Sequence, residues 1–190
     1  MTGGLILLIV LALLAIFGVF IYNQLVQLKH NVGKAWSNID VLLKQRHDEL
    51  PKLVETCKQY MQFEQETLEK VMQARSQVAS ARESRNISAL GQAEASLRAG
   101  LGNLFAVAEA YPELKTNETF RHLQARISGL ENAIADRREF YNDSVNVNNV
   151  RVEQFPDTLV ARLFAFRQFP LLRFATEEKK DVDVGQLFNR

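Results

Sequence analysis

The residues of this chain that could do chemistry are three histidines, His30, His47 and His122, and a single cysteine, Cys57. A hydrolase needs a nucleophile beside a base, or two histidines spaced to bind zinc on one helix face. The segment HDELP around His47 does not have the HExxH spacing, and no GxSxG motif occurs. Cys57 has no histidine one or two helical turns away. We therefore predict no catalytic residue and expect each histidine on a helix surface.

Composition argues against several other kinds of site. No Gly-rich phosphate loop, dinucleotide fingerprint or calcium loop is present, and one cysteine forms neither an internal disulfide nor a cysteine zinc cluster. Lys and Arg number 23 against 22 Asp and Glu, so no strongly basic surface for nucleic acid is expected. We predict no cofactor, no metal and no nucleic-acid partner.

Four charged residues are candidates for a buried polar network: Arg46, Glu64, Glu94 and Arg137. Each stands where the helical pattern around it has apolar side chains. Because a lone buried charge is costly, two arrangements are expected. Either the aliphatic parts of these side chains pack on the apolar seam while the charged groups reach solvent at its edge, or the charges pair across helices and fix the register of the helices. A catalytic role is the weakest reading, since no nucleophile and base accompany them.

The elements that carry these residues are predicted to be helices. Only four prolines and nine glycines interrupt the chain, too few for the turns of a β-sandwich or barrel. Apolar residues recur at alternating steps of four and three from Val32 to Ala81, which predicts one long helix packed along a seam. Pro51 falls inside it and predicts a kink or tight break near residues 47–51.

Two further seams follow, at residues 87–111 and 120–141, with short polar connections before each. These connections hold the helix-capping candidates Ser84, Asn86, Thr116 and Asn117. Short connections between long helices predict antiparallel neighbours, so the expected fold is all-α, an N-terminal transmembrane helix followed by an antiparallel up-and-down bundle of long helices. The Asn-rich stretch before Pro156 fits a fraying helix end or a short extended piece equally well.

Residues 3–21, GGLILLIVLALLAIFGVFI, contain no charged or strongly polar side chain. About 20 helical residues span roughly 30 Å, the thickness of a bilayer's hydrocarbon core. No Lys or Arg precedes the run and no small-x-small site ends it, so we expect a retained anchor. Positive charges follow the span, which places the body in the cytoplasm by the positive-inside rule; the other side of the membrane is the alternative. The residues concerned are Lys29, Lys34, Lys44 and Arg46.

A stripe of apolar residues follows the anchor: Val32, Trp36, Ile39 and Leu43. The predicted second helix is too short to cover it, and an exposed apolar strip of that size is usually an interface. We predict that the chain forms a homo-oligomer through this stripe. Cover by a later segment of the same chain is the alternative.

The C-terminal segment at residues 156–175 is aromatic and basic, and has no acidic residue after Asp157. Such a segment either lies in the membrane interface or docks on the protein's own core. Its candidate membrane-surface residues are Arg162, Phe164, Phe166, Arg167, Phe169 and Arg173. The expected organisation is an anchor at 1–22, a bundle at 23–155, this segment, and a polar tail at 176–190.

Five blocks of the sequence resemble the bacterial LemA family: YNQLV, AWSNIDVLLKQRHDELPKLVETCKQY, LFAVAEAYPELK, REFYNDSV and FPDTLVARLFAF. They occur in order over nearly the whole chain. The resemblance implies a membrane anchor in the bacterial envelope, with membrane lipid as a partner, and a helical-bundle body. It implies no catalytic residue. Some relatives carry a lipoprotein-type signal with a cysteine in place of the span, which puts the same body outside the cytoplasm.

These features favour a non-enzymatic, membrane-anchored scaffold of the bacterial inner membrane that self-associates or binds another envelope protein. A membrane-tethered hydrolase is the second hypothesis, although its candidates are only the three histidines and scattered acids. A ligand-binding bundle is the third, with a pocket lined by Trp36, Tyr60, Tyr111 and Tyr141. Aromatic residues at helical spacing more often belong to a core.

Overall fold

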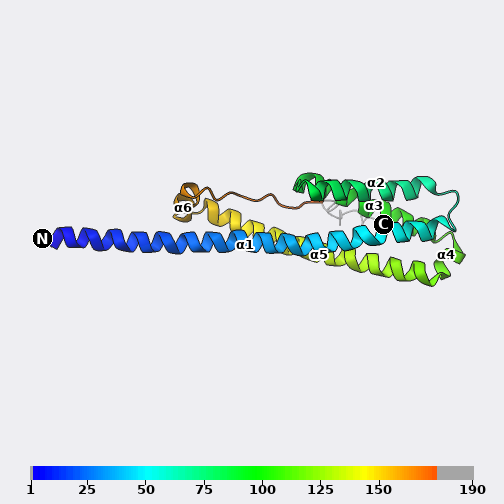
Figure 1. The fold of residues 1–190 in the computed structure, drawn as a ribbon, viewed down its shortest axis with the longest axis horizontal. Helices are drawn as coiled ribbons and strands as arrows, with labels where there is room; N and C mark the ends of the chain where they lie inside the picture. Colours follow the sequence, from blue (N-terminus) through cyan, green and yellow to red (C-terminus); the bar gives the residue numbers. More distant parts are fainter. Residues whose placement is uncertain (1, 175–190) are drawn as a thin grey trace, which may run out of the picture. The chain divides into compact units, whose positions relative to one another are not determined.

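A computed structural model describes residues 2–174 of the chain. Within that range the protein is helical and has no strand, which confirms the all-α prediction (Figure 1). The polar tail predicted at 176–190 lies outside the described residues. The helices are α1 (Thr2–Lys58), α2 (Gln65–Glu83), α3 (Ile87–Ala108), α4 (Pro112–Thr116), α5 (Glu118–Glu153) and α6 (Asp157–Leu163).

The described chain divides into two compact units. The first unit contains residues 2–39 and 136–171, and the second contains residues 40–135 and 172–174. This differs from the single bundle expected at 23–155. The reason is the length of two helices, because α1 has 57 residues and α5 has 36, and each contributes to both units.

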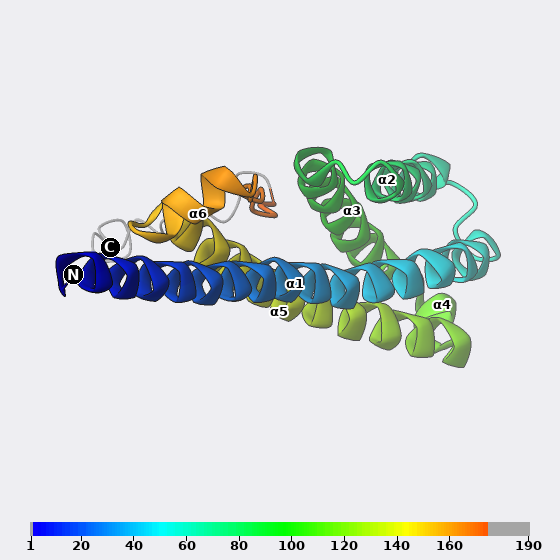
Figure 2. The same ribbon diagram turned by 60° about the vertical axis from the view of Figure 1, so that its left-hand side comes forward.

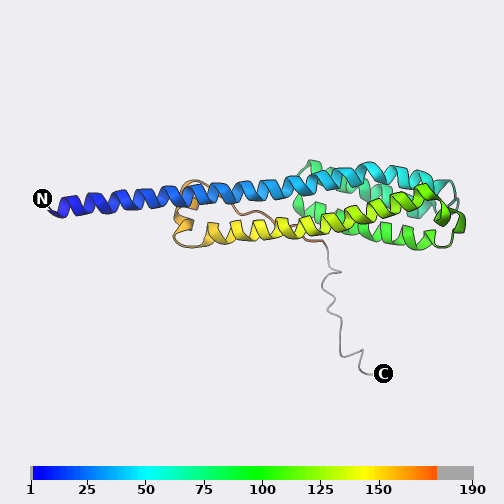
Figure 3. The ribbon, with the colours of Figure 1, turned by 90° about the horizontal axis from the view of Figure 1, so that it is seen from below.

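In the first unit, the end of α5 runs antiparallel beside α1, and α6 folds back against α1 (Figure 3). The apolar beginning of α1 is long and hydrophobic enough to cross a membrane, and nearly all of it is exposed. That exposure distinguishes it from the core helix of a soluble protein, whose apolar face would be buried. The chain therefore fits a single-pass membrane protein.

The stripe predicted as an open interface is not open. Val32 and Ile39 are buried in the first unit and Leu43 in the second, while Trp36 is half-buried and meets Tyr141 edge to face at 5.9 Å. The stripe was expected to be open because the predicted second helix, at residues 87–111, is too short to cover it. A later segment of the same chain covers part of it instead, since Tyr141 of α5 packs on Trp36. The Asn-rich stretch is in fact helical, so α5 continues to Glu153.

In the second unit, α2 and α3 pack together and run in opposite directions (Figure 1). The last part of α1 and the first part of α5 belong to the same unit (Figure 2). Two capping predictions are confirmed by hydrogen bonds at 3.0 Å. The Asn86 side chain accepts from the backbone N–H of Ala89 at the start of α3, and the Asn117 side chain accepts from that of Phe120 in α5. Each cap satisfies a backbone donor that a helix start leaves unpaired.

A kink or a tight break was predicted at residues 47–51. The break is wrong, since α1 continues through Pro51, and the kink stays a prediction. A proline inside a helix leaves the carbonyl four residues earlier without its backbone donor. Here that carbonyl belongs to His47, and it accepts a hydrogen bond at 2.9 Å from Nε of Arg75 on α2. A side chain from another helix thus replaces the missing backbone donor.

The helix instead ends at Lys58, so Val32 to Ala81 is two helices rather than one. The connection at residues 59–64 contains no Gly or Pro. It is fixed by tertiary contacts, because Met61 is buried and the Asn117 side chain donates to the Tyr60 hydroxyl at 3.1 Å. The buried positions of α2 keep the spacing of the earlier seam, which is why the apolar pattern did not reveal this turn.

Candidate functional site

The second unit contains a buried cluster of three charged side chains from three helices. Arg46 of α1 donates through its two terminal nitrogens, one to Glu94 of α3 and the other to Glu131 of α5. The exposed fractions are 1% for Arg46, 2% for Glu94 and 20% for Glu131. A planar guanidinium suits this arrangement, because its fork can bind two carboxylates at once.

The cluster places one positive charge against two negative charges. Burial alone would lower the pKa of Arg46, but attraction to Glu94 and Glu131 outweighs it, so the pKa is raised and the guanidinium stays charged. Burial raises the pKa of Glu94, and repulsion by Glu131 adds to it, against the attraction of Arg46. The Nε of Arg46 is buried without a hydrogen-bond partner. The arrangement is suited to fixing the register of three helices.

Two of the four residues predicted for this network belong to it and two do not. Arg46 and Glu94 meet as described, whereas Glu64 is half-exposed just before α2 and Arg137 is exposed on α5 in the first unit. Glu131 was not predicted because the apolar seam of α5 was assigned to Leu130, the residue before it. Its spacing of four residues from buried Ile127 is the signal that could have identified it.

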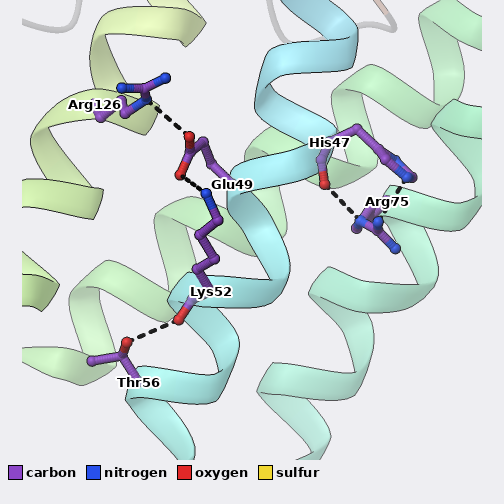
Figure 4. Close-up of polar contacts among 6 residues, drawn as sticks. All are labelled: His47, Glu49, Lys52, Thr56, Arg75 and Arg126. Atoms are coloured by element: carbon purple, nitrogen blue, oxygen red, sulfur yellow. Dashed lines mark hydrogen bonds and ion pairs between the residues drawn. The ribbon is translucent and has the colours of Figure 1, made fainter.

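Further polar contacts join α1 to its neighbours on either side of the cluster (Figure 4). Glu49 accepts from Arg126 of α5 at 3.1 Å and from Lys52 at 3.2 Å. The imidazole Nε2 of His47 lies 2.7 Å from a terminal nitrogen of Arg75. Burial and the nearby Arg75 charge lower the pKa of His47, so its ring is neutral at pH 7.

The other residues with potential chemistry are dispersed. His30 and His122 are exposed, and burial raises the pKa of the Cys57 thiol to about 12. Among residues 2–174, no group of three His, Cys, Asp or Glu side chains could hold a metal ion. Of the aromatic residues considered for a pocket, Trp36 and Tyr141 pack together in the first unit, whereas Tyr60 and Tyr111 belong to the second.

An extended strap, defined here as residues 166–171, follows α6 and the turn at residues 164–165 in the first unit. The side chain of Asn149 on α5 both accepts from the N–H of Phe169 and donates to its carbonyl, each at 2.9 Å. Asn148 donates to the Arg167 carbonyl at 3.3 Å, and the Tyr141 hydroxyl donates to the Pro170 carbonyl at 3.0 Å. The asparagines of α5 thus supply the hydrogen bonds that the extended backbone lacks.

The residues predicted to contact the membrane surface lie in and around this strap. Phe166 is half-buried against a small core of Ile21, Leu25 and Ala161, and Phe169 is half-buried as well. The remaining four are exposed: Arg162, Phe164, Arg167 and Arg173, of which Arg173 belongs to the second unit. The segment therefore combines residues docked on the protein with residues that face outward.

A second apolar stripe lies on α5 in the first unit. Phe140, Val147 and Val150 are each about half exposed. Their spacing of seven and three residues places them on one face of the helix. We call these three residues the outer stripe, because the buried residues Tyr141 and Val145 occupy the other face of α5.

Comparison with known proteins identifies a family. The model of the LemA family matches residues 35–185. Protein LemA of Metamycoplasma hominis is 27% identical over 169 residues, which are 88% of this chain and 75% of the relative. Magnetosome protein MamQ 2 of Paramagnetospirillum magneticum is 28% identical over 88 residues, 46% of this chain. The chain spans only about a third of the length of that magnetosome protein. With most of its length matched, this chain belongs to the LemA family.

Proposed function

We propose that this protein is a non-enzymatic scaffold of the bacterial inner membrane, anchored by α1, that self-associates through the outer stripe of α5. The observation that carries the proposal is the exposure of Phe140, Val147 and Val150 on one face of a helix outside the apolar anchor. Single exposed apolar residues are normal, but three in line on one helix are characteristic of a contact surface.

The spacing of the outer stripe suits a second copy of the same helix. Phe140 and Val147 take successive a positions of a heptad repeat, and Val150 takes the d position after them. Asp143 takes the d position between Phe140 and Val147, and Gln154 takes the a position after Val150. Copies anchored in one bilayer by the same end have α5 running in the same direction. They can therefore pair as parallel helices related by a twofold axis, each residue meeting its equivalent.

The state of Cys57, the one cysteine of the sequence, supports a non-enzymatic role. The Cys57 thiol is buried, and its raised pKa of about 12 leaves almost no thiolate at pH 7. Arg46 and Glu94 of the charged cluster are nearly sealed from solvent. The charges that follow the span, including Lys29 and Lys34, favour a cytoplasmic body.

Disulfide cross-linking tests the interface. A disulfide requires β-carbons within roughly 4.5 Å, a distance that equivalent residues reach only along the seam of a parallel pair. We expect Val147→Cys to give a covalent dimer under mild oxidation of the full-length protein in membranes. The matched control is Asn146→Cys, which is exposed on the same helix turn but lies off the stripe. The unsubstituted protein, with buried Cys57, controls for background.

The mass of the detergent-solubilised protein gives an independent readout. Light scattering should show an oligomer for the unsubstituted protein and a monomer for Val147→Lys, with unchanged helix content by circular dichroism. Monomers of both proteins, together with no cross-linking at Val147, would refute self-association through this stripe.

A second surface supports binding of another envelope protein. Phe63 is 91% exposed in the connection between α1 and α2. Met61, two residues earlier, lines a groove of about 590 Å³ together with Val54, Leu68 and Met72. A photo-crosslinking residue at position 63 should capture a distinct protein in cells. Capture of no protein would remove this alternative.

A further inference from the structure

A second apolar surface of the first unit lies beside the apolar part of α1. On one face, α6 buries Ala161 against Ile21 and Leu25. On the other, Leu159 and Leu163 are 59% and 78% exposed. The first unit covers only one of these two apolar faces of α6. The exposed face suits a second apolar environment.

A groove of about 340 Å³ separates α6 from α1. Its lining is apolar except for one phenol hydroxyl: Ala15, Gly18, Val19, Tyr22, Val160, Leu163 and Phe164. Ala15, Gly18 and Val19 belong to the uncharged run at residues 3–21. Because α1 and α6 share this groove, the medium that surrounds Ala15 and Val19 also surrounds Leu163. For the membrane-spanning part of α1, that medium is lipid.

The depth of α6 follows from the geometry of α1. Ala15 precedes Ile21 by six residues, which is about 9 Å along a helix axis. Helices that lie in a membrane interface bury their apolar face by roughly 5–10 Å. The groove therefore brings the end of α6 to the depth of an interfacial helix, in the leaflet from which α1 emerges.

The charges around α6 match a phospholipid surface. Asp157, the last acid before residue 175, is buried and paired with Arg151 at 3.0 Å. Arg162 and Arg167 are exposed, and long arginine side chains can reach from an apolar surface to the phosphate groups. Tyr22, packed edge to face on Phe164 at 4.8 Å, stands at the end of the apolar run, where interfacial aromatic residues occur.

We propose that α6, together with Phe164, inserts into the lipid interface as a second membrane contact, and that the groove beside α1 holds an acyl chain of a phospholipid. This contact goes beyond the scaffold function and does not depend on self-association. A single spanning helix leaves the protein free to rotate about the membrane normal and to tilt. A second contact in the same leaflet restricts the tilt of the first unit, including the outer stripe of α5.

Fluorescence quenching by brominated phospholipid tests the insertion. Trp36 is the sole tryptophan and is replaced by Trp36→Phe, which keeps an aromatic ring against Tyr141. Leu163→Trp then supplies the reporter in the full-length protein, reconstituted in phosphatidylcholine vesicles with bromine high on the acyl chains. We expect the emission to fall by about half or more relative to unbrominated vesicles, since the side chain lies within an interfacial depth.

Glu139→Trp is the matched control, since Glu139 is exposed in the first unit and lies off the outer stripe. It precedes Val152, which packs on the core at Ile21, by thirteen residues or about 20 Å of helix. Its emission should be unchanged by brominated lipid. Leu159→Trp is a second reporter on α6 in case Leu163→Trp lowers the helix content. Equal emission in both vesicle types for a folded α6 reporter, or equal quenching of the Glu139 control, would overturn the proposal.

Discussion

Replacing Arg46 by methionine removes the positive charge from the buried cluster and leaves Glu94 and Glu131 facing each other. Breaking a buried ion pair by removing one partner costs about 3–5 kcal/mol of unfolding free energy, because an uncompensated buried charge remains. Glu94 is 2% exposed, so it cannot regain solvation without disturbing α3. We expect urea unfolding of full-length Arg46→Met in detergent, followed by circular dichroism, to show a loss of this size.

The pH dependence of this variant has a defined sign. The pKa of Glu94 is already raised above its ordinary value of 4.5 by burial, and loss of Arg46 removes the attraction that opposes the shift. A carboxyl with a higher pKa in the folded state binds protons more tightly there than in the unfolded state. Unfolding free energy then falls as pH rises from about 4.5 through the folded pKa. Arg46→Met should therefore regain stability, relative to the unsubstituted protein, as pH is lowered toward 4.5.

Replacing all three charged residues of the cluster with apolar residues tests whether the loss of unfolding free energy comes from the buried charge or from the change in side-chain shape. The triple variant Arg46→Met, Glu94→Leu, Glu131→Leu leaves no buried charge, and such replacements are often neutral or stabilising. We expect its stability to lie within about 1 kcal/mol of the unsubstituted protein. A triple variant as unstable as Arg46→Met, or a loss in Arg46→Met that does not shrink at low pH, would refute the assignment of the penalty to uncompensated charge.

Three further predictions concern single positions in the second unit. Arg75→Ala leaves the His47 carbonyl without its donor and should lower the unfolding free energy by about 1–3 kcal/mol, measured by urea titration. Gly91→Ala should destabilise in thermal unfolding, because its added β-carbon would lie 2.0 Å from a backbone oxygen of the C-terminal segment; Gly102→Ala, whose β-carbon meets nothing, should instead stabilise by up to about 1 kcal/mol. Cys57 should resist maleimide at pH 8 until urea unfolds the protein, as expected for a buried thiol with a pKa of about 12.

The helices and the anchor were predictable from the sequence because their signals are local. An uncharged apolar run and a repeat of four and three residues need no knowledge of the partner surface. The turn at residues 59–64 gave no such signal. It depends on burial of Met61 and on a bond between Asn117 and Tyr60, which are far apart in the sequence. Its residues have no intrinsic preference for a turn.

Pro51 illustrates the opposite error. Its local chemistry predicts an interruption, and the helix continues because Arg75 bonds to the carbonyl that Pro51 leaves unpaired. In the charged cluster, Arg46 and Glu94 were identifiable because they interrupt apolar seams. Glu131 lies at a half-exposed position of α5, where a charged residue is ordinary. Its spacing from Ile127 places it beside the seam, but its contact with Arg46 depends on how α1 and α5 pack.

The Asn-rich end of α5 shows why the sequence left that stretch open between a helix end and a short extended piece, although it is helical. Asparagine lowers helix propensity, so residues 146–149 weaken the signal for a continuing helix. The same side chains are suited to bond an extended backbone, and Asn149 uses both its donor and its acceptor on Phe169. An apolar residue at position 149 would strengthen the helix and leave the strap without these bonds. The local cost of Asn149 to the helix is thus offset by its two hydrogen bonds to the strap. The strap comes directly after α6 in the chain, so these bonds also hold the end of the proposed lipid contact.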